Sequence, residues 1–232
     1  IVSVADILND PDCNYCYVTG SGALCWSCSE KSVPIKNFKS SSLVKYHLTS
    51  VRDVDGTNIT VLAVDNVLTI VKNHHLVAAA RHVSHEVDAI SSIFIVRGNC
   101  PKFLLLGDID GNLFWLDFNT LAIQRTVKVG CGRVMICGVP HSSNILINTQ
   151  DDLLLLTFNL KGNYDLKRIY TKLSIKHLSA RDGTNIDILT SKLDICSFKI
   201  PKEIPAPVLI KGCISNDTHF HSKFIHLPCS TR

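Results

Sequence analysis

Long apolar runs are missing from this sequence. The longest, such as Phe103–Leu106 and Leu153–Leu156, are far too short to cross a bilayer, so we expect no transmembrane segment. A disorder-type composition is also missing, because 46% of the residues are hydrophobic and only 19% are charged. This balance excludes a disordered chain and fits a domain with a sizeable core.

The linear signatures of common enzymes are absent as well. The chain has no phosphate-binding loop ending in Gly-Lys-Ser/Thr, no Gly-x-Ser-x-Gly elbow, no His-Glu-x-x-His pair and no dinucleotide-binding glycine fingerprint. We therefore predict a protein without catalytic residues and without a cofactor. An enzyme whose site draws single residues from several repeats remains an alternative, because such a site leaves no linear motif.

A large excess of charge of one sign is missing too. The formal net charge is only +4, a weak preference for acidic partners and no nucleic-acid signature by itself. Because the chain begins at Ile1 instead of Met, we expect a fragment or a processed product from which a targeting segment could have been removed.

What is present is β-structure, seen most clearly between Phe103 and Val129. Two apolar runs, Phe103–Gly107 and Leu113–Phe118, flank the Asp110-Gly111 turn, and a third run follows at Ala122–Val129. Asp-Gly between two apolar runs is a strong hairpin signal, because glycine supplies the positive φ that a two-residue turn needs. Helical periodicity is weak, and the best helical candidate, Leu76–Val83, is short.

The same strand pattern recurs along the chain. Five short apolar segments, each preceded by a polar turn, begin with a leucine at intervals of 44, 45, 40 and 40 residues: Leu24, Leu68, Leu113, Leu153 and Leu193. Two turns also match in sequence, Asp55-Gly56-Thr57-Asn58 and Asp182-Gly183-Thr184-Asn185. A period of about 40–45 residues with four strands per unit is typical of β-propellers.

In this pattern the chain resembles the WD40-like and FG-GAP-like β-propeller repeat superfamily. The Gly-His and Trp-Asp dipeptides of strict WD40 repeats and the three-aspartate calcium loop of FG-GAP blades are missing. We predict an all-β fold, one β-propeller domain over 1–232 with about five four-stranded blades, at about 1–42, 43–86, 87–132, 133–171 and 172–211, and a closing tail at 212–232. The resemblance also allows these blades to be part of a larger, seven-bladed ring. A β-sandwich or barrel is the rival architecture.

Four cysteines near the N-terminus form the sharpest candidate site. Cys13 and Cys16 precede Cys25 and Cys28, and two Cys-x-x-Cys pairs are the typical donor set of tetrahedral zinc. The competing interpretation makes Cys16, Cys25 and Cys28 strand residues of the first blade. Residues three apart in a strand face opposite sides, so Cys25 and Cys28 can share a metal only if the strand breaks between them.

Ten cysteines are many for an intracellular protein, but six of them are scattered singly and several lie within apolar runs. Buried thiols behave as small hydrophobic groups, so we predict an intracellular protein of the cytoplasm or nucleus. Two sequons, at Asn58 and Asn216, keep a secreted protein open as the alternative. The Asp-x-Asp-Gly pieces at Asp53 and Asp108 read as turns in preference to calcium loops.

A basic strip runs from Lys161 to Arg181. It holds six cations and a single acid, Asp165; the cations are Lys161, Lys167, Arg168, Lys172, Lys176 and Arg181. The strip could bind nucleic acid, acidic lipid or an acidic partner peptide, or form a solvated face.

We predict a non-enzymatic scaffold that binds the other protein subunits of a complex. The expected partner-binding loops are Lys31–Tyr46, His74–His85 and the basic strip. A nucleic-acid-associated propeller that uses the strip is the alternative.

Overall fold

The computed structural model describes residues 1–200 apart from 2, 9–11, 36–37, 39–44, 54, 74, 84–86, 88, 97–102, 140–141, 143, 159–163, 172–173 and 181–182. Residues 201–232 lie outside the described part. The secondary structure of the described residues consists of nineteen strands and contains no helix. A helix able to span a bilayer is accordingly not found among them.

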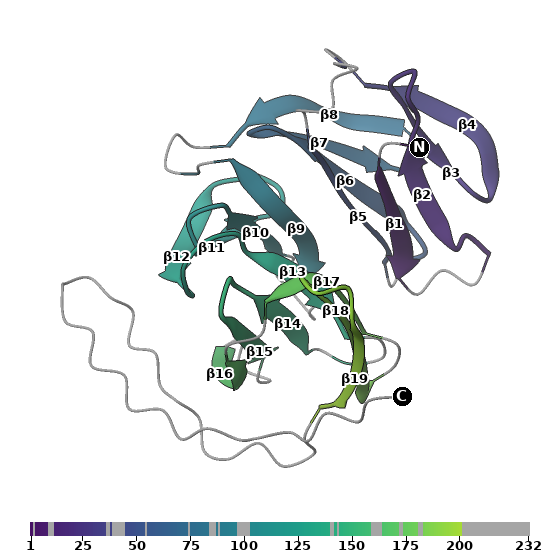
Figure 1. The fold of residues 1–232 in the computed structure, drawn as a ribbon. Helices are drawn as coiled ribbons and strands as arrows, with labels where there is room; N and C mark the ends of the chain where they lie inside the picture. The colour runs from purple at the N-terminus through teal and green to yellow at the C-terminus, as the bar shows by residue number, and fades with distance from the viewer. Residues whose placement is uncertain are drawn as a thin grey trace. The chain divides into compact units, whose positions relative to one another are not determined.

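Two antiparallel meanders form the first sheet (Figure 1). Its first four strands are β1 (Ser3–Leu8), β2 (Tyr15–Val18), β3 (Ala23–Trp26) and β4 (Ser29–Pro34). The next four are β5 (Tyr46–Arg52), β6 (Asn58–Val64), β7 (Val67–Lys72) and β8 (His75–His82). The meanders join where β1 pairs in parallel with β5, with Ile7 opposite Ser50 and Leu8 opposite Val51.

Three further antiparallel sheets follow in chain order. One contains β9 (Ile90–Val96), β10 (Phe103–Asp108), β11 (Asn112–Asp117) and β12 (Ile123–Lys128). The next contains β13 (Met135–Gly138), β14 (Ile145–Asn148), β15 (Asp152–Phe158) and β16 (Tyr164–Thr171). The last contains β17 (Ile175–Ala180), β18 (Asn185–Thr190) and β19 (Ile195–Lys199).

The predicted all-β fold of five propeller blades is confirmed, and the rival sandwich is not what the strands form. The first four blades have four strands each, whereas the fifth has three within the described residues. One local prediction was wrong. The segment predicted as a connection, His74–His85, contains the strand β8, because its pairing with β7 decides the backbone conformation where the sequence periodicity is ambiguous.

The Asp110-Gly111 turn lies where the sequence predicts it, between β10 and β11. Gly111 has a φ of +93°, which side chains disfavour. A Cβ added there would approach the carbonyl oxygen of Gly130 to 2.2 Å, so this position also needs glycine for space. The amide of Val129 donates to the carbonyl of Gly111 at 2.9 Å and fixes the two backbones side by side.

The repeat predicted from leucine spacing coincides with the third strand of each of the first four blades. Leu24, Leu68, Leu113 and Leu153 are all buried in β3, β7, β11 and β15. Leu193 departs from this pattern, because it lies in the turn before β19, has a φ of +68° and is 67% exposed. The repeat therefore loses its register in the fifth blade.

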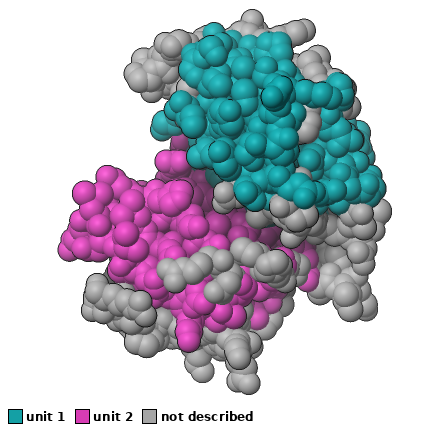
Figure 2. Space-filling view, turned by 90° about the vertical axis from the view of Figure 1, so that its right-hand side faces the viewer, with its two compact units in different colours: residues 1–108, 115–124 teal, residues 109–114, 125–232 magenta. Residues whose placement is uncertain are grey.

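The residues group into two compact units, coloured separately in Figure 2. Unit 1 comprises 1–108 and 115–124, and unit 2 comprises 109–114 and 125–232. In unit 1, the buried indole of Trp26 donates to the hydroxyl of Thr60 at 3.2 Å, and Thr60 bonds Ser50 at 2.8 Å. This chain of hydrogen bonds ties the first blade to the second and satisfies three buried polar groups.

Unit 2 has its own apolar core. One cluster packs strands of the fourth and fifth blades together, with Leu146, Leu155 and Ile169 against Ile186 and Phe198. The continuous apolar runs of β14 and β15 are buried on both faces, whereas β18 buries alternating residues.

Candidate interaction surfaces

The described cations of the basic strip lie on strands. Lys167 and Arg168 lie in β16 and Lys176 lies in β17, so these three residues are not in the loop that was expected. Lys176 is exposed. The remaining strip residues, Lys161, Lys172 and Arg181, lie outside the described residues.

Acidic side chains neutralise part of the strip. The ammonium of Lys167 lies 3.4 Å from the carboxylate of Asp165, and the guanidinium of Arg168 lies 2.9 Å from the carboxylate of Asp152. The carboxylate of the second pair is the more sheltered, because the side chain of Asp152 is 15% exposed and that of Asp165 is 34% exposed. Burial raises the pKa of Asp152, and the neighbouring Arg168 acts in the opposite direction. Two of the three described cations of the strip thus have anionic partners.

Arg125, a cation outside the basic strip in sequence, contacts a tyrosine of the strip. The guanidinium of Arg125, on β12, lies over the ring of Tyr164 at 4.9 Å from its centre. Such a contact is a cation–π interaction, worth about 0.5–1 kcal/mol at an exposed site. No sequence signal could have paired the two residues, because they belong to different blades.

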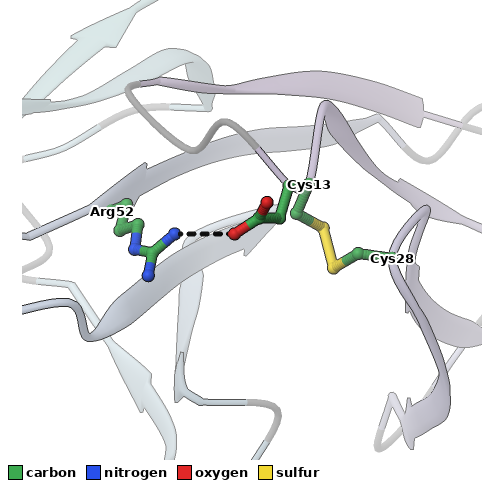
Figure 3. A network of polar contacts seen from close by, with 4 residues as sticks. Cys13, Cys28 and Arg52 are labelled. Carbon is green, nitrogen blue, oxygen red and sulfur yellow. Dashed lines mark hydrogen bonds and ion pairs between the residues drawn. A yellow bond between two sulfur atoms is a disulfide. The ribbon is translucent and has the colours of Figure 1, made fainter.

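The four N-terminal cysteines have three different environments. Cys13 and Cys28 form a disulfide across a sequence separation of 15 residues (Figure 3). Cys16 is fully buried, and its thiol contacts the carbonyl of Ala5 at 3.7 Å, whereas Cys25 is partly exposed. Beside the disulfide, Arg52 and Asp12 form an ion pair at 3.4 Å.

Cys28 lies in the turn between β3 and β4, so the strand does break after Trp26 and the interpretation of Cys28 as a strand residue was wrong. The break brings Cys28 to Cys13, a pairing that neither sequence interpretation included. Within the described residues, His, Cys, Asp and Glu side chains do not gather in any group of three suited to a metal. Zinc binding by Cys13, Cys16, Cys25 and Cys28 stays an untested prediction that requires the disulfide to be reduced first.

Turn chemistry accounts for the Asp-x-Asp-Gly piece at Asp53. The amide of Thr57 donates to the carboxylate of Asp55 at 2.9 Å, and the amide of Gly56 donates to the carbonyl of Asp53 at 3.0 Å. These are the local hydrogen bonds for which Asp and Gly are favoured in turns.

An apolar and aromatic surface covers one face of the first blade. Val4 on β1 lies opposite Tyr17 on β2, and Tyr17 lies opposite Cys25 on β3, so the three side chains share a face. Tyr15 extends the row, with its ring 6.0 Å from that of Tyr17. Val4 is 60% exposed and Tyr15 is 43% exposed, while the opposite face of the same strands is buried in the core. We call Val4, Tyr15, Tyr17 and Cys25 the β1–β3 outer face.

Solved structures of β-propellers resemble the chain. The β-propeller domain of Myceliophteria thermophila Cps50 (Swd1) aligns with a TM-score of 0.60 at 12% identity, over 86% of this chain and 69% of that one. A chain of BBS1N in complex with ARL6DN aligns with a TM-score of 0.59 at 11% identity, over 86% and 65%. A chain of the mitotic checkpoint complex aligns with a TM-score of 0.56 at 16% identity, over 85% and 63%.

These similarities establish the fold alone, because the identities are low. This chain spans about two thirds of the length of each of these structures. A family model described as "Uncharacterised protein YJR039W middle domain" matches residues 1–198. A comparison with curated proteins gives no match.

Proposed function

Because the chain belongs to the family of the YJR039W middle domain and has a β-propeller fold, we propose that it is a non-enzymatic scaffold within a multiprotein complex. Two of the similar propellers support this proposal, since one is BBS1N in complex with ARL6DN and another belongs to the mitotic checkpoint complex. Propellers present rigid strands and connections around a rim, which suits them to hold several partners.

The β1–β3 outer face is the single observation that carries the proposal. Aromatic residues are enriched where proteins bind one another, because a tyrosine ring buries a large area and keeps a polar hydroxyl for the rim. Large apolar side chains clustered on an exposed sheet face mark a surface that a partner covers. The partner that fits is a protein with a complementary apolar ridge.

The basic strip supports a nucleic-acid role less well. Binding to phosphates releases counterions only when the cations are available, and Lys167 and Arg168 already contact carboxylates. A non-enzymatic role and the absence of a cofactor rest on the missing catalytic motifs. An intracellular location is part of the proposal because the Cys13–Cys28 disulfide is outnumbered by five described cysteines that form none: Cys16, Cys25, Cys131, Cys137 and Cys196.

The test introduces charge into the β1–β3 outer face of the full-length protein. Val4→Glu and Tyr15→Glu place carboxylates on that face, and Thr126→Glu on the exposed strand β12 is the matched control. The tagged proteins are purified from their own cells and their partners are quantified by mass spectrometry. We expect the first two variants to lose a stoichiometric partner and the control to keep it, with all three still folded by circular dichroism.

Two results would overturn this assignment. One is that Val4→Glu and Tyr15→Glu retain every partner. The other is that cross-linking places a segment of the same polypeptide on the β1–β3 outer face, since an additional blade of this protein would then be its occupant.

A further inference from the structure

The Cys13–Cys28 disulfide differs from every other described cysteine of the chain. It is the one disulfide among the residues that the structure describes, and five further cysteines there form none. Two of these five, Cys16 and Cys25, lie in the same blade. A disulfide in the reducing, intracellular location proposed above is typically a transient bond that responds to the thiols around it.

The two cysteines joined in Figure 3 differ in exposure. Cys28 lies in the turn between β3 and β4 and is exposed, whereas Cys13 is 1% exposed. A thiolate from solution opens a disulfide by attacking one sulfur and expelling the other. Access therefore favours attack at the sulfur of Cys28, with Cys13 as the leaving group.

The expelled sulfur has a hydrogen-bonding group in place. The hydroxyl oxygen of Ser27 lies 3.7 Å from the sulfur of Cys13. This oxygen accepts a hydrogen bond from the amide of Tyr15 at 3.2 Å, which leaves the hydroxyl proton available for the sulfur. A hydrogen bond to a thiolate stabilises it, so Ser27 favours the departure of Cys13.

The same serine connects the disulfide to the β1–β3 outer face. The amide of Ser27 donates to the carbonyl of Tyr15 at 2.9 Å, so the two residues exchange two hydrogen bonds. Tyr15 begins β2 shortly after Cys13, and Ser27 directly precedes Cys28. Opening the disulfide removes a constraint from both sides of this pair, whereas Tyr17 stays paired with β1 and β3.

We propose that Cys28 is a thiol-exchange site for a small thiol such as glutathione, and that exchange there regulates the end of the β1–β3 outer face that carries Tyr15. The regulation of partner binding rests on the proposed function, whereas the exchange chemistry does not.

The exchange takes place in two steps. The thiolate of the small thiol forms a bond to the sulfur of Cys28, the S–S bond breaks, and Cys13 leaves as a thiolate that takes a proton from water. A second small thiol attacks the sulfur of the first, which releases the small-molecule disulfide and the thiolate of Cys28. Two small thiols are oxidised and the protein disulfide is reduced, so electrons balance.

The first test treats the full-length protein with reduced glutathione in the absence of oxygen. Samples are trapped with excess alkylating reagent and mapped by peptide mass spectrometry. Reduced glutathione adds only to a sulfur that is already in a disulfide, so Cys25 and Cys131 are internal controls that stay unmodified. We expect glutathione on Cys28 and alkylation of Cys13 in the same molecules.

The rate of opening shows whether the folded protein reacts. It is compared with the rate for the chain unfolded in urea. A disulfide reached only through global unfolding would open roughly 10³-fold or more slowly than in the unfolded chain. We expect a much smaller difference, because Cys28 is exposed in the folded state.

The second test measures amide hydrogen exchange at Tyr15, Ser27 and Tyr17. We expect opening of the disulfide to accelerate exchange at Tyr15 and Ser27 on the order of tenfold and to leave Tyr17 unchanged. Cys28→Ser should show the fast exchange without glutathione, whereas Cys131→Ser, the matched control, should respond as the unaltered chain does. Retention of the partner by the tagged protein should decrease over the same range of glutathione concentration.

Different results would overturn different parts of the proposal. Glutathione on Cys13, or opening as slow as global unfolding, would refute the exchange site. Equal exchange at Tyr15 in the two states would refute its coupling to the disulfide. A response at Tyr15 with every partner still bound would refute the regulation. The proposed function fails separately, when Val4→Glu and Tyr15→Glu keep their partners.

Discussion

The Cys13–Cys28 disulfide should contribute measurably to the stability of the first blade. It connects the segment before β2 to the turn after β3 and closes a loop with a sequence separation of 15 residues. A crosslink over such a loop restricts the unfolded chain and stabilises the folded state by about 3 kcal/mol. For a chain of this size, that loss corresponds to a decrease in Tm of roughly 6–12 °C.

The assay is thermal unfolding followed by circular dichroism, with and without dithiothreitol. We expect reductant and Cys28→Ser to lower the Tm by similar amounts, because both remove the same crosslink. Cys131→Ser is the matched control, since Cys131 is exposed and forms no disulfide. The neighbouring Asp12–Arg52 ion pair adds little, because exposed pairs contribute about 0–1 kcal/mol.

The reasoning fails if the unaltered chain keeps its Tm in reductant and Cys28→Ser is equally stable. The sulfurs of Cys13 and Cys28 would then not be bonded in solution. Stoichiometric zinc in the purified protein, lost on Cys28→Ser, would in that case support the four-thiolate site predicted from the sequence.

Three further predictions test other parts of the structure. Gly111→Ala should cost about 2–4 kcal/mol in denaturant unfolding, because its Cβ would meet a backbone oxygen at a positive φ, while Gly20→Ala, with nothing within 4 Å, should cost far less. Thr60→Val should cost about 1–3 kcal/mol in the same assay, because it leaves a buried indole N–H without its acceptor. Burial raises the pKa of Asp152 above its ordinary value of 3.8. The contribution of this carboxyl group to the stability of the folded state therefore decreases as the pH rises through the range just above that value. Arg168→Gln should raise the pKa of Asp152 further, and NMR titration would measure the change.

Local chemistry explains why the fold could be predicted from the sequence. The strands around Asp110-Gly111 fall within a residue or two of their predicted positions, because the turn residues and the alternation of apolar side chains act over a few positions. The fifth blade shows where this reasoning ends. Leu193 matches the repeat by spacing, yet the turn before β19 exposes it, and spacing cannot report a local shift of two residues.

The candidate sites depended on contacts between distant residues and were harder to predict. The disulfide of Cys13 and Cys28 requires the strand break after Trp26, which apolar patterning does not encode. The partners of Lys167 and Arg168 lie two and sixteen positions away, and only the pairing of β15 with β16 brings Asp152 to Arg168. The β1–β3 outer face was missed in the sequence. Alternation of apolar and polar residues shows that a strand has two faces, but it does not show which face other elements of the fold cover.

Radical footprinting of tyrosines would test the scaffold proposal most directly. The full-length protein is labelled once in the assembly purified from its cells and once after its partners have been removed. The proposal predicts that Tyr15 and Tyr17 are protected in the assembly and become reactive when the partners are gone, while Tyr164, packed beneath Arg125, changes little. Equal reactivity of Tyr15 and Tyr17 in both states would contradict the claim that the β1–β3 outer face binds a partner protein.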